Sequence, residues 1–250
     1  MRKTALSFFW IVAAVTACSG QSTLYFPQIA DGAQGGGINW ISCLGLTNTA
    51  SPGAPAATGS ITFTQDNGSP WSLALIDETS QPVGTGSTIS FQLAGAETRF
   101  YCTTGVSPVA TGFATVTSGP TVTGGAAFLE FADNGNTAAG SAGVLAASPL
   151  TQQMIFVARG EQTAVAIANH GTSTATITFQ LLDKNGAVVL PSVTRTLAAK
   201  NHSALFANQL FPNIPARFFG TLRITSSIPL VATSLIFDSQ FYTVPVFSLQ

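Results

Sequence analysis

The sequence predicts an all-β fold made of two tandem antiparallel β-sandwich modules after an N-terminal signal peptide. Short runs dominated by Val, Ile, Thr and Phe are separated, about every 8–12 residues, by clusters of Gly, Pro, Asn and Asp, which is typical of sandwiches and barrels. Almost no segment carries a helical period. Blocks from the first half of the chain also recur in the same order in the second half, which indicates an internal duplication.

Residues 1–17 have the pattern of a signal peptide. Arg2 and Lys3 precede about a dozen mostly apolar residues, too few to span a bilayer as a stable anchor. The following "VTAC" resembles the lipobox of bacterial lipoproteins, and this resemblance implies lipid attachment at Cys18, with residues 18–23 as a tether. Ordinary cleavage is the alternative, because Val15 and Ala17 also satisfy a small-residue cleavage site. Either route exports the protein.

The three cysteines fit this interpretation. An odd thiol in an exported protein needs an explanation, and lipidation of Cys18 leaves Cys43 and Cys102 as a pair. A bond between them is expected in an oxidising compartment and would close a loop of about 60 residues, worth on the order of 4 kcal/mol. Two buried free cysteines are the alternative.

The duplication is visible in two aligned blocks. Residues 43–68 align with residues 164–186, and both blocks contain Ile-Thr-Phe and end in an Asn-Gly turn. Residues 112–128 align with residues 220–237. Asn and Gly adopt positive φ at low cost, so these sequences predict tight turns between strands.

The first module is expected to cover residues 24–149 and the second residues 150–250, each burying its own core and folding alone. Within the aligned blocks Asn48 matches Asn169, and the apolar Leu44 and Leu46 match Val165 and Ile167. Alternate residues of a strand face opposite sides of the sheet, so Cys43 should point away from the core. The bridge is therefore expected on an outer sheet surface or at an edge.

Two tandem sandwiches behind a lipobox resemble the immunoglobulin-like modules of bacterial surface proteins. The opening "LYFPQIADG", with "TNT" and "ANH" at strand ends, resembles a group of uncharacterised secreted bacterial proteins built from such paired repeats. This resemblance implies a fold but no known activity. Two features depart from the immunoglobulin pattern: Trp71 lies too far after Cys43, and Phe100, beside Tyr101, holds the tyrosine-corner position.

The composition excludes nucleic acid as a partner, because charged residues make up only 8% of the chain and form no basic stripe. Of the two histidines, His202 can be combined on paper with Ser203 and Asp183, but no nucleophile elbow supports a catalytic set. Surface or turn positions are expected for His170 and His202. No metal or cofactor site is expected: the acidic turns lack an EF-hand pattern, and "GAQGGG" lacks the lysine of a phosphate loop.

Aromatic residues offer the weak candidates for ligand binding. Trp71 and Tyr101 are considered for a stacking platform, with Trp71 the best exposed candidate, although core packing is the commoner role for such rings. The sequence thus favours a non-enzymatic, exported cell-envelope protein that presents paired modules for binding, adhesion or spacing. A glycan or a cell-surface protein is the expected partner, and contact with the membrane is expected only through Cys18. The alternatives are a secreted carbohydrate-binding module or a hydrolase with its site in the second module.

Overall fold

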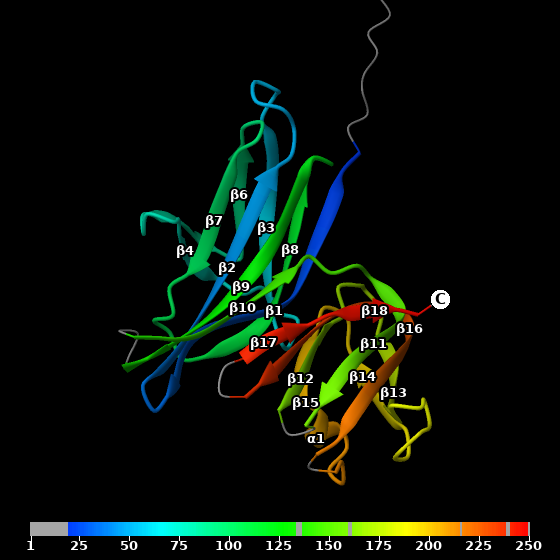
Figure 1. Ribbon diagram of the computed structural model, residues 1–250. Coiled ribbons are helices and arrows are strands. Elements are labelled where there is room, and N and C mark those ends of the chain that lie inside the picture. Colours follow the sequence, from blue (N-terminus) through cyan, green and yellow to red (C-terminus); the bar gives the residue numbers. More distant parts are fainter. Residues whose placement is uncertain (1–19, 134–136, 160–161, 216, 239–240, 250) are drawn as a thin grey trace, which may run out of the picture.

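The computed structural model describes residues 20–249 apart from 134–136, 160–161, 216 and 239–240. It is an all-β structure with 67% strand and 2% helix. Hydrogen-bonded ladders join the strands into one ten-stranded sheet from the first half of the chain and one eight-stranded sheet from the second. Figure 1 shows the first half, blue to green, beside the second half, yellow to red.

The first half contains ten strands. They are β1 (Ser22–Gly35), β2 (Ile38–Asn48), β3 (Ala57–Gln65), β4 (Leu73–Ile76), β5 (Pro82–Gly86), β6 (Thr88–Leu93), β7 (Thr98–Thr103), β8 (Ala110–Ser118), β9 (Val122–Ala132) and β10 (Thr137–Leu145). Strand β1 belongs to two layers, because Ser22–Asp31 pairs with β8 and Gly32–Gly35 pairs with β2. The sheet therefore folds back over its own core.

The second half contains eight strands and one helical turn. They are β11 (Leu150–Ala158), β12 (Thr163–Ala168), β13 (Ala175–Asp183), β14 (Val193–Leu197), β15 (His202–Phe206), α1 (Ala207–Leu210), β16 (Phe219–Phe237), β17 (Phe241–Val244) and β18 (Val246–Ser248). Strand β15 ends at Phe206, and Ala207 and Leu210 of the following turn α1 are buried.

The order of strand pairing is the same in the two halves. In the first half, β8 lies between β1 and β3, and β2 pairs with both β7 and β9. In the second half, the first part of β16 lies between β11 and β13, and β12 pairs with both β15 and the last part of β16. Strand β16 thus takes the place of β8 and β9 together, and β17 pairs with it as β10 pairs with β9.

A fully buried asparagine occupies the same position in each half. The Asn48 side chain donates to the Leu93 carbonyl at 3.1 Å and accepts from the Ala50 amide. Asn169 donates to the Leu197 carbonyl at 3.0 Å and accepts from the Gly171 amide. Each amide satisfies loop backbone groups that would otherwise be buried without partners, which explains a polar residue inside each half.

A hydroxyl group fixes the first strand of each half in a similar way. Ser42 Oγ exchanges two hydrogen bonds with the backbone of Ala30, and Thr163 Oγ1 does the same with Ala158. The sequence comparison did not single out these residues. Both hydroxyls are buried, so the bonds form away from competing water.

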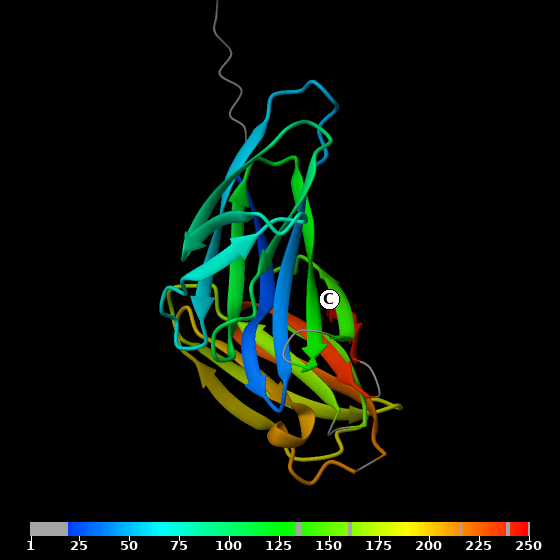
Figure 2. The same cartoon turned by 90° about the vertical axis from the view of Figure 1, so that its left-hand side faces the viewer.

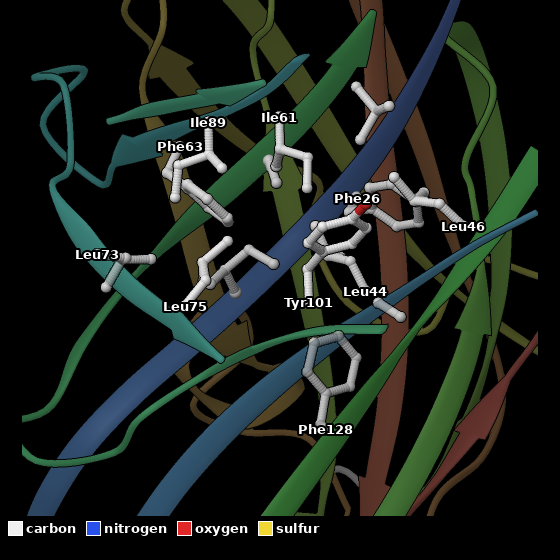
Figure 3. Close-up of a cluster of buried hydrophobic side chains, with 14 of the residues drawn as sticks. Phe26, Leu44, Leu46, Ile61, Phe63, Leu73, Leu75, Ile89, Tyr101 and Phe128 are labelled. Carbon is white, nitrogen blue, oxygen red and sulfur yellow. The ribbon is translucent and has the colours of Figure 1, made fainter. Parts of the chain in front are cut away.

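Each half surrounds an apolar core. Leu44 and Leu46 point inward as predicted, and Figure 3 shows Leu44 beside Tyr101 and Phe128. The second half has a separate core whose members include Val165, Ile167 and Phe179. The core of the first half also takes in Leu235 and Phe241 from the second half, so the two halves share part of their buried surface.

The disulfide Cys43–Cys102 is present, as predicted, and joins residues directly opposite each other on β2 and β7. Their neighbours Leu44 and Tyr101 lie in the core, so the bridge sits on the outer face of the sheet. This is the face that strand alternation predicted for Cys43.

Replacing Asn169 by Ala should lower the free energy of unfolding by about 2–4 kcal/mol, because several buried carbonyl and amide groups lose their partner together. Denaturant titration measures this. The exposed Asn185→Ala is the matched control and should change stability by less than about 0.5 kcal/mol. Equal effects of the two substitutions would contradict the structural role of Asn169.

Reduction of the Cys43–Cys102 bond should destabilise the first half by up to about 4 kcal/mol, because the open chain regains loop entropy. Unfolding monitored with and without reductant tests this, with the Cys43→Ser/Cys102→Ser double variant as the control that no longer responds. A wild-type transition that is unchanged by complete reduction would contradict the expectation.

Candidate interaction site at the junction of the halves

The two halves meet where β1 crosses the outer face of β12 and β16. A small buried cluster forms there from Phe113 of β8, Ala168 of β12 and Val231 of β16, with Tyr25 and Ala147 packed against it. Figure 2 shows the first half standing on the sheet of the second. The contact is apolar at its centre, as in a protein interface that stays closed.

A second apolar contact joins β10 and β17, which lie side by side in Figure 1. The Trp40 ring meets Phe237 and Phe241 at centroid distances of 6.5 and 5.5 Å. Gly140 lies directly against the Phe241 ring, where a Cβ atom would collide with it. Trp40 is partly buried against this shared cluster.

A polar contact lies at the far side of the junction. His202 Nδ1 is 2.7 Å from Asp66 Oδ1, and the hydroxyl of Thr111 donates to the other oxygen of the carboxylate. The His202 amide also donates to the Asp66 carbonyl. The His202 side chain is fully buried, so the prediction of a surface or turn histidine is wrong for this residue. Its partner is Asp66, and Asp183 instead accepts amides of its own turn.

The electrostatics of this contact favour an ionised carboxylate. Partial burial disfavours the charge on Asp66, but hydrogen bonds from His202 and Thr111 outweigh it, and the pKa of Asp66 lies below its ordinary value. An ionised carboxylate only accepts hydrogen bonds, so Nδ1 of His202 carries the hydrogen. His202 Nε2 is buried without a partner. The ring therefore joins the two halves through Nδ1, and neither ring nitrogen is exposed at the surface.

The other histidine is also part of the junction. The ring of His170 lies 4.4 Å from the ring of Tyr25, centroid to centroid, and Lys200 donates to the His170 carbonyl. Burial, together with the neighbouring charge of Lys200, lowers the pKa of His170. His170 follows a strand end, as the sequence indicated, but its ring contacts the opposite half.

A cavity of about 230 Å³ remains between the halves. It is lined by Gln28 of β1 and by residues of β12, β15 and β16, including Phe206 and Leu235. Gln28 Oε1 is buried without a partner, while its amide nitrogen makes one 3.4 Å bond to the Ile29 carbonyl. Gln209 and Thr233 are the other polar residues of the lining, and none of the lining residues is an acid or a base.

Two apolar surfaces remain uncovered elsewhere. The first, called here the apolar shelf, lies on the outer face of β7, β2, β9 and β10 and encloses about 520 Å³. It is lined by Cys43, Gly45, Thr47, Thr98, Phe100, Thr123, Gly124, Gly125, Ala126, Ala127, Gly143, Val144 and Leu145. The second, the aromatic patch, consists of Phe156, Phe219 and Phe247 on β11, β16 and β18, all exposed.

The two ligand-binding candidates from the sequence do not reach either surface. Trp71 is 6% exposed and Tyr101 is 3% exposed, and both belong to the core of the first half. The interpretation of Trp71 as an exposed stacking residue is therefore wrong. Its backbone pairs with Phe63 just after the Asn67-Gly68 turn, which turns the ring inward. Cys18, the predicted lipidation site, lies outside the described residues.

Within the part of the chain that the structure describes, no group of three or more His, Cys, Asp or Glu side chains is placed to hold a metal ion. In the same part, no helix has the length and apolar character needed to cross a membrane.

Comparisons with known proteins assign no family. No family model matches the chain, and no curated protein matches it. Among solved structures, the Anabaena sensory rhodopsin transducer is 23% identical with a TM-score of 0.31, over 35% of this chain and 96% of its own. A Thermotoga maritima protein is 15% identical with a TM-score of 0.33, over 40% of this chain and 90% of its own. The Arthrobacter globiformis T6 isomalto-dextranase is 13% identical with a TM-score of 0.27, over 82% of this chain and 35% of its own. Similarities this low carry no argument about function.

The contact between Asp66 and His202 should make the free energy of unfolding depend on pH in the acidic range. Because the pKa of Asp66 is lowered in the folded protein, its contribution is present above the unfolded value of about 4 and is lost as pH falls through the folded value. The carboxylate is half exposed, so the loss should not exceed about 1 kcal/mol. Unfolding measured between about pH 6 and pH 3 should show a smaller loss in Asp66→Asn than in wild type.

Asp183→Asn makes the same chemical change in the corresponding turn of the other half and serves as the control. If Asp66→Asn follows the wild-type pH profile throughout, the carboxylate does not stabilise the junction.

Proposed function

We propose that this protein is a non-enzymatic, exported protein of the cell envelope, whose two β-sandwich modules form one rigid unit for binding, adhesion or spacing. The modules arose by duplication of a single immunoglobulin-like unit. The repeated strand-pairing order supports this, as do the matching side-chain bonds of Asn48 and Asn169 and of Ser42 and Thr163.

The observation that carries the proposal is the use of both histidines. Imidazole is the side chain best suited to proton transfer near neutral pH. Here His202 is buried against Asp66 and His170 is packed on Tyr25, both between the halves. The groups most able to catalyse are thus used to hold two modules in a fixed arrangement, which suits a spacer or a scaffold.

The disulfide indicates the compartment. A bond between Cys43 and Cys102 persists in an oxidising environment outside the cytoplasm. The signal-peptide pattern of residues 1–17 and the lipobox at Cys18 supply the route and the anchor in this proposal. A glycan or cell-surface protein remains the proposed class of partner, although Trp71 and Tyr101 do not provide the contact.

The anchor is tested by metabolic labelling with palmitate. The protein expressed with its leader should carry the label, and Cys18→Ser should remove it, because the acyl chains are attached through that residue. The Cys43→Ser/Cys102→Ser double variant, which lacks the other two cysteines but keeps Cys18, should retain the label. Undiminished labelling of Cys18→Ser would show that the lipid is attached elsewhere.

The non-enzymatic role is tested with a panel of glycans, cell-wall polymers and ester and peptide substrates. Retention of a polymer without its turnover is expected. Turnover that is lost in His202→Gln, while thermal unfolding remains cooperative, would contradict the proposal.

A further inference from the structure

The two halves have equivalent outer sheet faces, but only one of these faces is covered by the rest of the molecule. Because β2 matches β12 in its pairing, Cys43, Gly45 and Thr47 of the apolar shelf correspond to Ala164, Ala166 and Ala168. In the second half this face is covered, since β1 of the first half crosses it. In the first half the same face is the uncovered apolar shelf.

The surface that covers the second half also has an equivalent. Tyr25, Phe113 and Ala147 of the first half pack on Ala168 and Val231. By strand pairing, these three residues correspond to Met154, Thr221 and Phe247 of the second half. The bridge between Tyr25 and Ala147 is matched by the pairing of Met154 with Phe247.

This equivalent surface contains the aromatic patch. Phe156, at the position of the Pro27–Gln28 bulge, is 49% exposed, Phe247 is 43% exposed and Phe219 is 63% exposed. The rings of Phe156 and Phe247 form an edge-to-face pair with centroids 5.3 Å apart. Large apolar side chains gathered on a protein surface commonly mark an interaction site.

The internal junction therefore leaves one unused copy of each of its two sides. We propose that the aromatic patch of one molecule docks on the apolar shelf of a second copy of this chain, repeating between molecules the contact that joins the two halves. The inference rests on the duplication in the proposed function and deepens it by naming the partner. The contact is heterologous, so it adds copies head to tail.

The shelf suits this occupant. The Phe100 ring lies over Gly45, and the 84% exposed Leu145 lies opposite Gly125, so these two side chains present apolar surface to an incoming ring. None of its lining residues is charged, so docking buries no unpaired ion. A patch-to-patch dimer would leave the shelf exposed and would not repeat the internal contact.

Sedimentation velocity of protein beginning at Gly20, the first described residue, tests the proposal. Wild type should self-associate with rising concentration. Phe156→Glu on the patch and Leu145→Glu on the shelf should each weaken association roughly 30-fold or more, the effect of losing a central apolar anchor. Val106→Glu is the matched control, because Val106 is 81% exposed, lies on neither surface and should leave association unchanged.

Mixing the two variants gives the sharpest result. The Phe156→Glu chain keeps its shelf and the Leu145→Glu chain keeps its patch, so the mixture should form a dimer and stop there. Gly143→Glu is a second shelf variant, since a Cβ atom at Gly143 meets only ordinary contacts. If wild type stays monomeric up to about 1 mM, the inference is overturned. It is also overturned if the mixture remains as monomeric as the separate variants. Either result leaves the polymer-binding and turnover assays, which test the proposed function, to be judged on their own.

Discussion

Much of this structure depends on one contact, the packing of β1 from the first half across the outer face of β12 and β16 in the second. Phe113, Ala168 and Val231 form its apolar centre, and the bond between His202 and Asp66 lies at its far side. Because this contact buries a sheet face that would otherwise be open to water, it joins the two halves into one body. Both histidines lie in this contact, His202 against Asp66 and His170 against Tyr25. The described part of the chain therefore has no accessible imidazole ring beside an acid.

The halves share their internal hydrogen bonds but differ where their outer faces must meet different surroundings. Asn48 and Asn169 bind equivalent loops. Ala96 and Lys200, the third residues of the turns 94–97 and 198–201 in these loops, both adopt positive φ. Outward positions carry the differences: alanines on β12 lie beneath the first half, whereas Cys43 and Gly45 on β2 face outward, and Cys43 forms the disulfide there. The proposed duplication would thus have preserved the bonds that stabilise each core and changed the surfaces that contact a neighbour.

Local sequence predicted a good part of this fold. Strand alternation placed Leu44 and Cys43 on opposite faces, and the Asn-Gly turns appear with Gly68 and Gly186 at the same positive φ. The repeated Thr-Phe, however, is two residues out of register: Gly112 lies opposite Gln65, Gly220 lies opposite Asp183, and so Leu181 occupies the place of Phe63. A shift of two keeps each side chain on its face, so hydrophobic alternation cannot detect it. Trp71 lies in the core, the commoner role for such rings, because the chain after the turn pairs again with β3. The meeting of His202 with Asp66 spans 136 residues and has no local signal, since it depends on how the halves dock.

The central claim is that each half has its own core and that the junction adds stability to the second. The most direct measurement is equilibrium unfolding of residues 150–250 alone, compared with the same segment in the full chain by hydrogen exchange. The account predicts a cooperative β-rich transition without any cysteine. It also predicts faster exchange in β12 and β16 than in the full chain, because their outer face loses its cover. An unfolded second half would contradict separate cores, and identical exchange in the two contexts would contradict a stabilising junction.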